Sequence, residues 1–136
     1  MVRIEATYQG HLHCRAQHGP SQATIETDAP VDNQGRGESF SPTDLVATAL
    51  GTCILTTMGI VAQREGVSID GSHITVDKEM TTVGPRRIAR LVVHLVLTIP
   101  RSADPNGTIA AVAHACPVSR SLDPKLKVDV TVVWKS

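Results

Sequence analysis

Two cysteines are the residues of this chain best suited to chemistry. Cys53 lies in a long apolar segment that follows Ser41 and Pro42, and Cys116 directly precedes Pro117. They are much too far apart in the sequence to form a Cys-x-x-Cys redox motif. If the fold brings the two thiols together, they form a pair that can reduce a substrate and then close into a disulfide. If it does not, each is a small buried hydrophobe, which is the usual role of a free cysteine.

The composition limits the classes of protein in which such a pair could act. The chain has 136 residues, a length that fits a single domain over residues 1–136 with a core of its own. Its 13 Lys and Arg balance its 13 Asp and Glu, and it holds only one Trp, one Tyr and one Phe, so we expect no nucleic-acid partner. Three cysteines are too few for a disulfide scaffold, and their number is odd.

The longest apolar run, residues 45–62, resembles a membrane span at first sight. It contains four Thr and two Gly, and Asp44 and Arg64 bracket it closely. A span needs about 20 predominantly apolar residues, so we expect a core helix and no membrane partner. The N-terminal sequence lacks the apolar stretch of a signal peptide. A cytoplasmic location is therefore expected, and in that reducing compartment a cysteine pair is more often catalytic or metal-binding than structural.

The elements that must position the cysteines follow from the hydrophobic patterns. They predict an α+β fold in the order βββ-α-ββ-α-(short α)-β. A helix should begin at the Ser41–Asp44 capping box and run to about Arg64, with apolar residues on every side and therefore buried all round. A second helix is expected over roughly 105–115. The predicted strands are 4–10, 12–17, 23–27, 73–80, 88–99 and 126–134.

With this element order, the chain resembles the OsmC/Ohr family of osmotically induced and organic hydroperoxide resistance proteins. The most specific matches are the Ser-Pro-Thr-Asp-Leu helix start at 41–45 leading to Cys53, and Ala-Cys-Pro-Val at 115–118. The glycine-containing string from Asp32 to Pro42 looks like the OsmC-like branch of the family. The resemblance covers essentially the whole chain.

The resemblance implies both an assembly and a reaction. The assembly is an intertwined homodimer, in which central long helices are wrapped by antiparallel sheets and the active sites lie at the subunit interface. The reaction is thiol-dependent reduction of organic hydroperoxides or hydrogen peroxide in stress defence, without a cofactor. Cys53 would be the peroxidatic thiol that becomes a sulfenic acid, and Cys116 the resolving thiol that closes the disulfide. A dithiol such as a lipoyl group restores some family members.

The sequence departs from the family at the groups that activate the thiolate. A thiol must ionise to act as a nucleophile, and apolar surroundings disfavour the ion, so a cation or donor must compensate. Peroxidase branches use an arginine near the early strands and a glutamate just before the helix, where this chain has Thr43. We expect Arg36 with Glu38 to take these roles, because their loop leads into the helix. The other candidates for activating Cys53 are Arg15, Arg86 and His13.

Two alternatives remain open at the level of sequence. One is a non-catalytic OsmC-like stress protein that binds a small apolar ligand or a partner and keeps its cysteines as core residues. The other is a metal site built from His11 and His13, which would share a face of one strand. No further ligand stands at a characteristic spacing, so we expect no metal site. We assign no role to Cys14.

Overall fold

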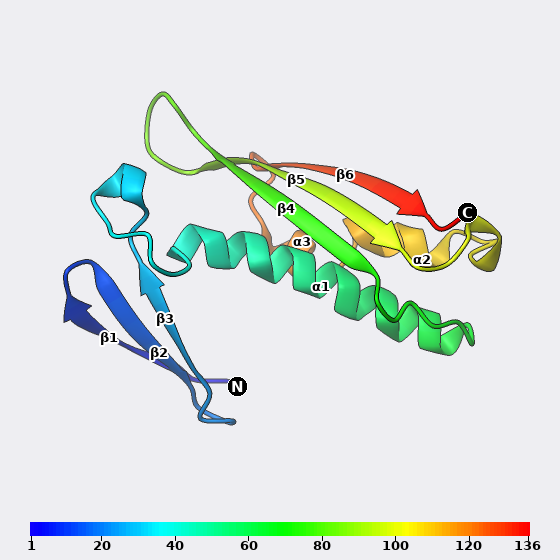
Figure 1. Ribbon diagram of the computed structural model, residues 1–136, viewed down its shortest axis with the longest axis horizontal. Coiled ribbons are helices and arrows are strands. Elements are labelled where there is room, and N and C mark those ends of the chain that lie inside the picture. Colours follow the sequence, from blue (N-terminus) through cyan, green and yellow to red (C-terminus); the bar gives the residue numbers. More distant parts are fainter. The chain divides into compact units, whose positions relative to one another are not determined.

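The computed structural model describes residues 1–136, and the chain divides into two compact units, residues 1–46 and 47–136. Figure 1 shows the elements of both units. The predicted α+β class is confirmed, with two three-stranded sheets and one long helix. A single domain over residues 1–136 stays a prediction.

The first unit is an antiparallel sheet in the order β1-β2-β3. Its strands are β1 (Ile4–Gly10), β2 (His13–His18) and β3 (Thr24–Asp28), each within about a residue of its predicted start. The turn between β1 and β2 places His11 and Leu12 at φ 54° and 60°. Two left-handed residues in a two-residue turn match the right-handed twist of the flanking strands, which explains a tight hairpin here.

The loop after β3 leads into the long helix. A short 3₁₀ helix, η1 (Val31–Asn33), is followed by Gly35, where a Cβ would collide with the Ala29 backbone, so only glycine allows this close approach. The predicted capping box is confirmed. The Ser41 backbone N–H donates to the Asp44 carboxylate at 2.9 Å, and the Asp44 N–H donates to Ser41 Oγ at 3.0 Å. This reciprocal pair fixes the helix start.

The second unit is built on a sheet in the order β4-β5-β6, with β4 (His73–Met80), β5 (Ile88–Leu97) and β6 (Lys127–Trp134). The expected antiparallel pairing holds for β4 with β5, as it does for β1–β3. Strands β5 and β6 run parallel instead. The long segment 98–126 explains the difference, because it provides the crossover that a parallel pair requires and a hairpin does not.

Three short pieces of helix make this crossover. They are η2 (Arg101–Ala103), α2 (Thr108–Ala111) with η3 (Val112–His114), and α3 (Pro117–Ser121). The single helix predicted over 105–115 is therefore wrong in length and partly in type. The buried Asp104 carboxylate accepts the backbone N–H groups of Ile109 and Ala110 at 3.1 and 3.0 Å, which holds the helix start at Thr108.

The helix α1 (Pro42–Arg64) lies along one face of the β4-β5-β6 sheet (Figure 1). Its buried residues recur at helical spacing and join the core with the inward face of β5. They are Ala47, Leu50, Gly51, Ile54, Met58 and Ala62. Burial on all sides, as predicted, is wrong for the single chain, because Thr52, Thr56 and Ile60 on other faces are exposed. The sheet covers only one side of the helix.

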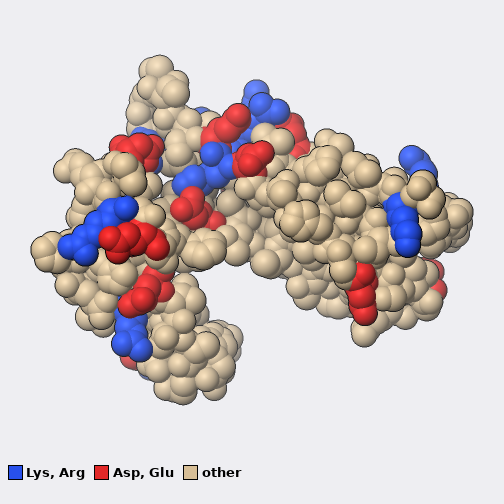
Figure 2. Space-filling view, viewed as in Figure 1, with Lys and Arg blue, Asp and Glu red and all other residues tan.

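Length and composition alone would also let α1 cross a membrane. Its mean hydropathy is 1.9, and 33% of the most apolar window is buried within the structure. On the molecular face shown in Figure 2, acidic and basic side chains are interspersed.

Candidate active site

Cys53 is a half-buried residue on α1, and it packs against the core of the second unit. Gly51 lies on the turn that precedes it and lets α1 approach β4 closely. A Cβ on Gly51 would lie 3.0 Å from Val76 Cγ2 and 3.6 Å from Ile74 Cγ2.

Cys116 is completely buried and caps a helix. It is the N-cap of α3, Pro117 occupies the first turn, and the Ser119 backbone N–H donates to the Cys116 Sγ at 3.4 Å. The Cys-Pro sequence predicts this cap, because proline fits the first helical position and cysteine then precedes it. Arg120 Nε also donates to the Ala115 carbonyl at 2.9 Å, which holds the backbone next to Cys116.

The fold brings Cys53 and Cys116 together, although they are distant in sequence. The Cys53 side chain lies close enough to the Cys116 thiol to affect its pKa. Burial is the largest influence on the pKa of Cys116 and raises it; the Ser119 N–H lowers it, and the neighbouring Cys53 raises it further. The net effect is a pKa above the usual value, so Cys116 remains a protonated thiol at neutral pH. All three cysteines of the chain are free thiols.

A second polar group contacts Cys53 and was missed at the level of sequence. Thr57 Oγ1 lies 4.0 Å from the Cys53 Sγ, one helical turn further along α1. The i, i+4 spacing was the available signal, since such residues are neighbours on one helix face.

The residues expected to activate the thiolate are found in three places. Arg36 and Glu38 are exposed in the loop before α1, and Arg15 is exposed on β2, all within the unit 1–46. Arg86 is exposed in the connection between β4 and β5. Both thiols belong to the unit 47–136, and a partnership of any of these residues with Cys53 stays a prediction.

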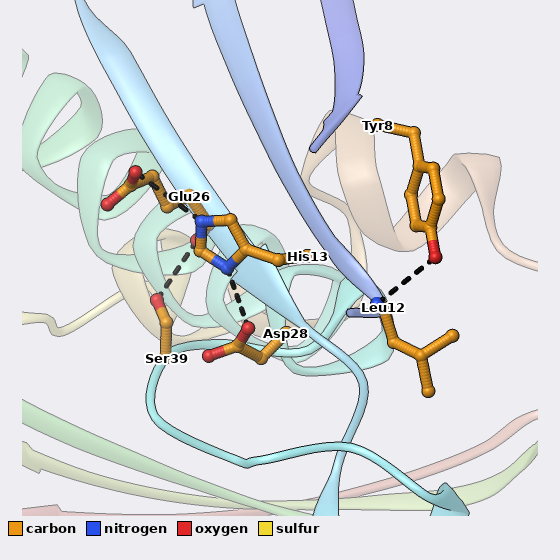
Figure 3. A network of polar contacts seen from close by, with 6 residues as sticks. All are labelled: Tyr8, Leu12, His13, Glu26, Asp28 and Ser39. Carbon is orange, nitrogen blue, oxygen red and sulfur yellow. Dashed lines mark hydrogen bonds and ion pairs between the residues drawn. The ribbon is translucent and has the colours of Figure 1, made fainter. Parts of the chain in front are cut away.

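His13 takes part in a network of its own, drawn in Figure 3. Its Nδ1 lies 2.6 Å from the carboxylate of Asp28, which is 3% exposed, and its Nε2 lies 3.4 Å from Glu26. The hydrogen bond to Asp28 is the largest cause that raises the pKa of His13 above its usual 6.5. The expected sharing of a strand face by His11 and His13 is wrong, because His11 lies in the hairpin turn. The network ties β2 to the end of β3.

Comparison with known proteins gives the family. The family model described as OsmC-like protein matches residues 35–131, a range that includes both Cys53 and Cys116. The chain therefore belongs to the OsmC-like family, as the resemblance in sequence suggested. No curated protein matches the chain in sequence.

Solved structures agree with this fold over nearly the whole chain. A protein from Psychrobacter arcticus, named for osmotic stress induction and a detoxification response, is 38% identical with a TM-score of 0.88, covering 97% of this chain and 96% of that one. An OsmC-like protein from Mycoplasma pneumoniae is 19% identical with a TM-score of 0.81, covering 100% and 98%. An organic hydroperoxide resistance protein from Legionella pneumophila is 16% identical with a TM-score of 0.78, covering 98% and 96%. The last two support the fold alone.

Proposed function

We propose that this protein is a thiol-dependent peroxidase that reduces organic hydroperoxides, and hydrogen peroxide with them, in stress defence. The observation that carries the proposal is the proximity of a half-buried Cys53 to a fully buried Cys116. Cys53 is partly exposed to solvent and Cys116 is not. The apolar core around the pair suits an alkyl hydroperoxide better than a charged substrate.

The first step is oxidation of Cys53. Its thiolate attacks the terminal oxygen of the hydroperoxide and the O–O bond breaks. The departing alkoxide takes up a proton and leaves as the alcohol. Cys53 is thereby oxidised to a sulfenic acid, and the peroxide is reduced by the same two electrons.

The second step closes the disulfide. The Cys116 sulfur attacks the sulfenic sulfur of Cys53, the S–S bond forms, and the sulfenic hydroxyl leaves as water with the proton from the Cys116 thiol. An external dithiol of the lipoyl type then reduces the disulfide by exchange and is itself oxidised to a disulfide. The backbone N–H of Ser119 at 3.4 Å stabilises negative charge on Cys116 when it serves as the leaving group.

Arg36 and Glu38 belong to this proposal as the groups that favour the Cys53 thiolate. Replacing Arg36 by Gln should slow peroxide-driven oxidation of Cys53 at neutral pH. If Arg36 is only a solvated surface charge, the replacement should leave this rate unchanged. Arg15→Gln and Arg86→Gln test the other two arginine candidates, and Arg3→Gln is the matched control, because it removes an exposed guanidinium that is not a candidate.

A homodimer with interface active sites, in the cytoplasm, completes the proposal. Exposed apolar side chains support it, since Ile60 on α1 is 46% exposed, and Ile4, Tyr8 and Ile25 on the first sheet are more than half exposed. Sedimentation analysis at micromolar concentration should give twice the chain mass. Ile60→Lys should shift the sample toward the monomer if this face of α1 is covered in the dimer.

The deciding experiment counts thiols. Fully reduced protein is treated with cumene hydroperoxide or, separately, with hydrogen peroxide, and the products are mapped by mass spectrometry. The proposal expects rapid loss of two thiols and a disulfide between Cys53 and Cys116. Cys116→Ser should instead stop at a sulfenic acid on Cys53 that dimedone traps, and Cys53→Ser should leave Cys116 reduced. Survival of both thiols in excess peroxide would rule out catalysis with these substrates.

The second candidate is a non-catalytic OsmC-like stress protein that binds a small apolar ligand or a partner. It is favoured by the position of Cys116, which caps α3 and fills the core, two roles that a structural cysteine can perform without any redox chemistry. Inertness toward both peroxides would make this the leading function.

A further inference from the structure

We propose that Thr57 is a further catalytic residue, whose hydroxyl donates a hydrogen bond to the Cys53 sulfur and stabilises its thiolate. This inference rests on the proposed function, because it assigns the donor that Cys53 needs in order to ionise. The argument begins with the immediate surroundings of Cys53. The Thr57 hydroxyl lies 4.0 Å from its sulfur, the Cys116 thiol is close enough for the two cysteines to interact, and all three residues belong to the same unit of the chain.

The contact of the Thr57 hydroxyl with Cys53 differs from the hydrogen bond that another threonine of α1 makes. A threonine inside a helix usually turns its hydroxyl to the carbonyl four residues earlier. Thr52 does so, because its Oγ1 donates to the Thr48 carbonyl at 2.8 Å. Thr57 instead has the sulfur of Cys53 as its polar side-chain contact. The two threonines lie on one helix, so the difference reflects their surroundings rather than the propensity of threonine.

Chemistry favours Thr57 as the donor once Cys53 ionises. A thiolate has no proton and can only accept, whereas the hydroxyl can turn its proton toward the sulfur. The observed distance of 4.0 Å is long, and while Cys53 is a neutral thiol either atom can donate. Hydrogen bonds to an ionised acceptor are shorter and about twice as strong as neutral ones, so the contact should tighten in the reactive form.

The Cys116 thiol is a poorer hydrogen-bond donor to the Cys53 thiolate than the Thr57 hydroxyl. Cys116 is itself a weak S–H donor. Its raised pKa also keeps it protonated until the sulfenic acid forms, and its proton then passes to the departing hydroxyl as its sulfur attacks. Thr57 is half-buried beside Cys53, so water competes less for its hydroxyl than it would at an exposed site. This divides the roles: Thr57 supports the first step of the reaction, and Cys116 performs the second.

The test measures the nucleophilicity of Cys53 by two independent reactions. Iodoacetamide labelling of the Cys53 peptide is followed by mass spectrometry across pH, and peroxide oxidation is followed separately. In Thr57→Val the labelling rate at pH 7 should fall about tenfold, the effect expected for one lost hydrogen bond to a charged group, and the labelling profile should move to higher pH. Thr57→Ser keeps the hydroxyl and should stay within about twofold of the unchanged protein.

Thr56→Val is the matched control, because Thr56 is the exposed neighbour on the same helix and no hydrogen bond joins it to Cys53. It should leave both rates unchanged. If Thr57→Val does not fold, Thr57→Ala serves as the second variant without a donor. An unchanged labelling profile in the variants without a donor overturns the proposal, and so does a Thr57→Ser as slow as Thr57→Val. Labelling needs no peroxide, so a protein inert to peroxide would contradict the proposed function while leaving this test intact.

Discussion

The close approach of α1 to β4 at Gly51 can be tested by adding one methyl group. Glycine inside a helix is unfavourable by about 1 kcal/mol relative to alanine, so Gly51→Ala gains that amount if space is available. The structure gives the opposing effect. The new Cβ would lie 3.0 Å from Val76 Cγ2, closer than van der Waals contact allows, and overpacking of a core costs about 1–3 kcal/mol. We expect a net destabilisation of about 1 kcal/mol.

A second glycine of the same helix is the control. A Cβ on Gly59 would meet nothing within 4 Å, so Gly59→Ala should stabilise the protein by about 0.5–1 kcal/mol through helix propensity alone. The difference between the two variants is then about 2 kcal/mol, although each adds the same methyl group to the same helix.

Urea denaturation gives the free energy of unfolding of both variants. The chain concentrations must be equal, since association would make stability depend on concentration. The Gly51 variant should also close the Cys53–Cys116 disulfide more slowly, because displacement of α1 from β4 moves Cys53. Equal stabilisation by the two alanine variants would refute the reasoning. The glycine at 51 would then have no packing role, and Cys53 would not depend on this approach for its position.

Two further predictions concern the other polar sites. Cys116→Ala should be about 1 kcal/mol less stable than Cys116→Ser in urea denaturation, because serine keeps an N-cap acceptor for the Ser119 N–H and alanine does not; equal stabilities would show that the cap contributes nothing. The raised pKa of His13 means that its pairing with Asp28 stabilises the fold fully below about pH 6.5 and ceases to do so as the pH rises through the folded-state pKa. The stability difference between the natural protein and His13→Gln should therefore shrink as the pH is raised above that value, and a difference that does not change with pH would contradict this assignment.

Most of the fold could be predicted because local patterns determine it. The strand predicted over 88–99 is confirmed as β5, whose alternating residues Leu91, Val93, Leu95 and Leu97 are buried, and the Ser41–Asp44 box correctly predicted the start of α1. The parallel pairing of β5 with β6 lay beyond such patterns. Alternation identifies a strand and its buried face, but it carries no information on the direction of the neighbouring strand.

The prediction of a single helix over 105–115 was wrong for a different reason. Residues 105–115 have a helical pattern, yet a carboxylate outside that pattern, Asp104, is buried and fixes the helix start at Thr108. The contact of Thr57 with Cys53 was missed because the rotamer of a threonine hydroxyl follows from packing rather than from sequence. Within the site, sequence motifs identified both thiols and the cap at Cys116, but the donor at Cys53 required side-chain positions.

The different burial of the two thiols gives an order to the proposed reaction. Cys53 and Cys116 lie close together, so negative charge on one opposes negative charge on the other. Cys116 has no exposed surface, and burial disfavours a thiolate there, whereas Cys53 is half-buried and has the Thr57 hydroxyl beside it. The proposed reaction therefore places the thiolate at Cys53, which is also the residue of the pair that is partly exposed to a dissolved hydroperoxide. Oxidation should therefore begin at Cys53. Cys116 is then a neutral thiol beside the oxidised sulfur, and its proton leaves with the sulfenic hydroxyl as water.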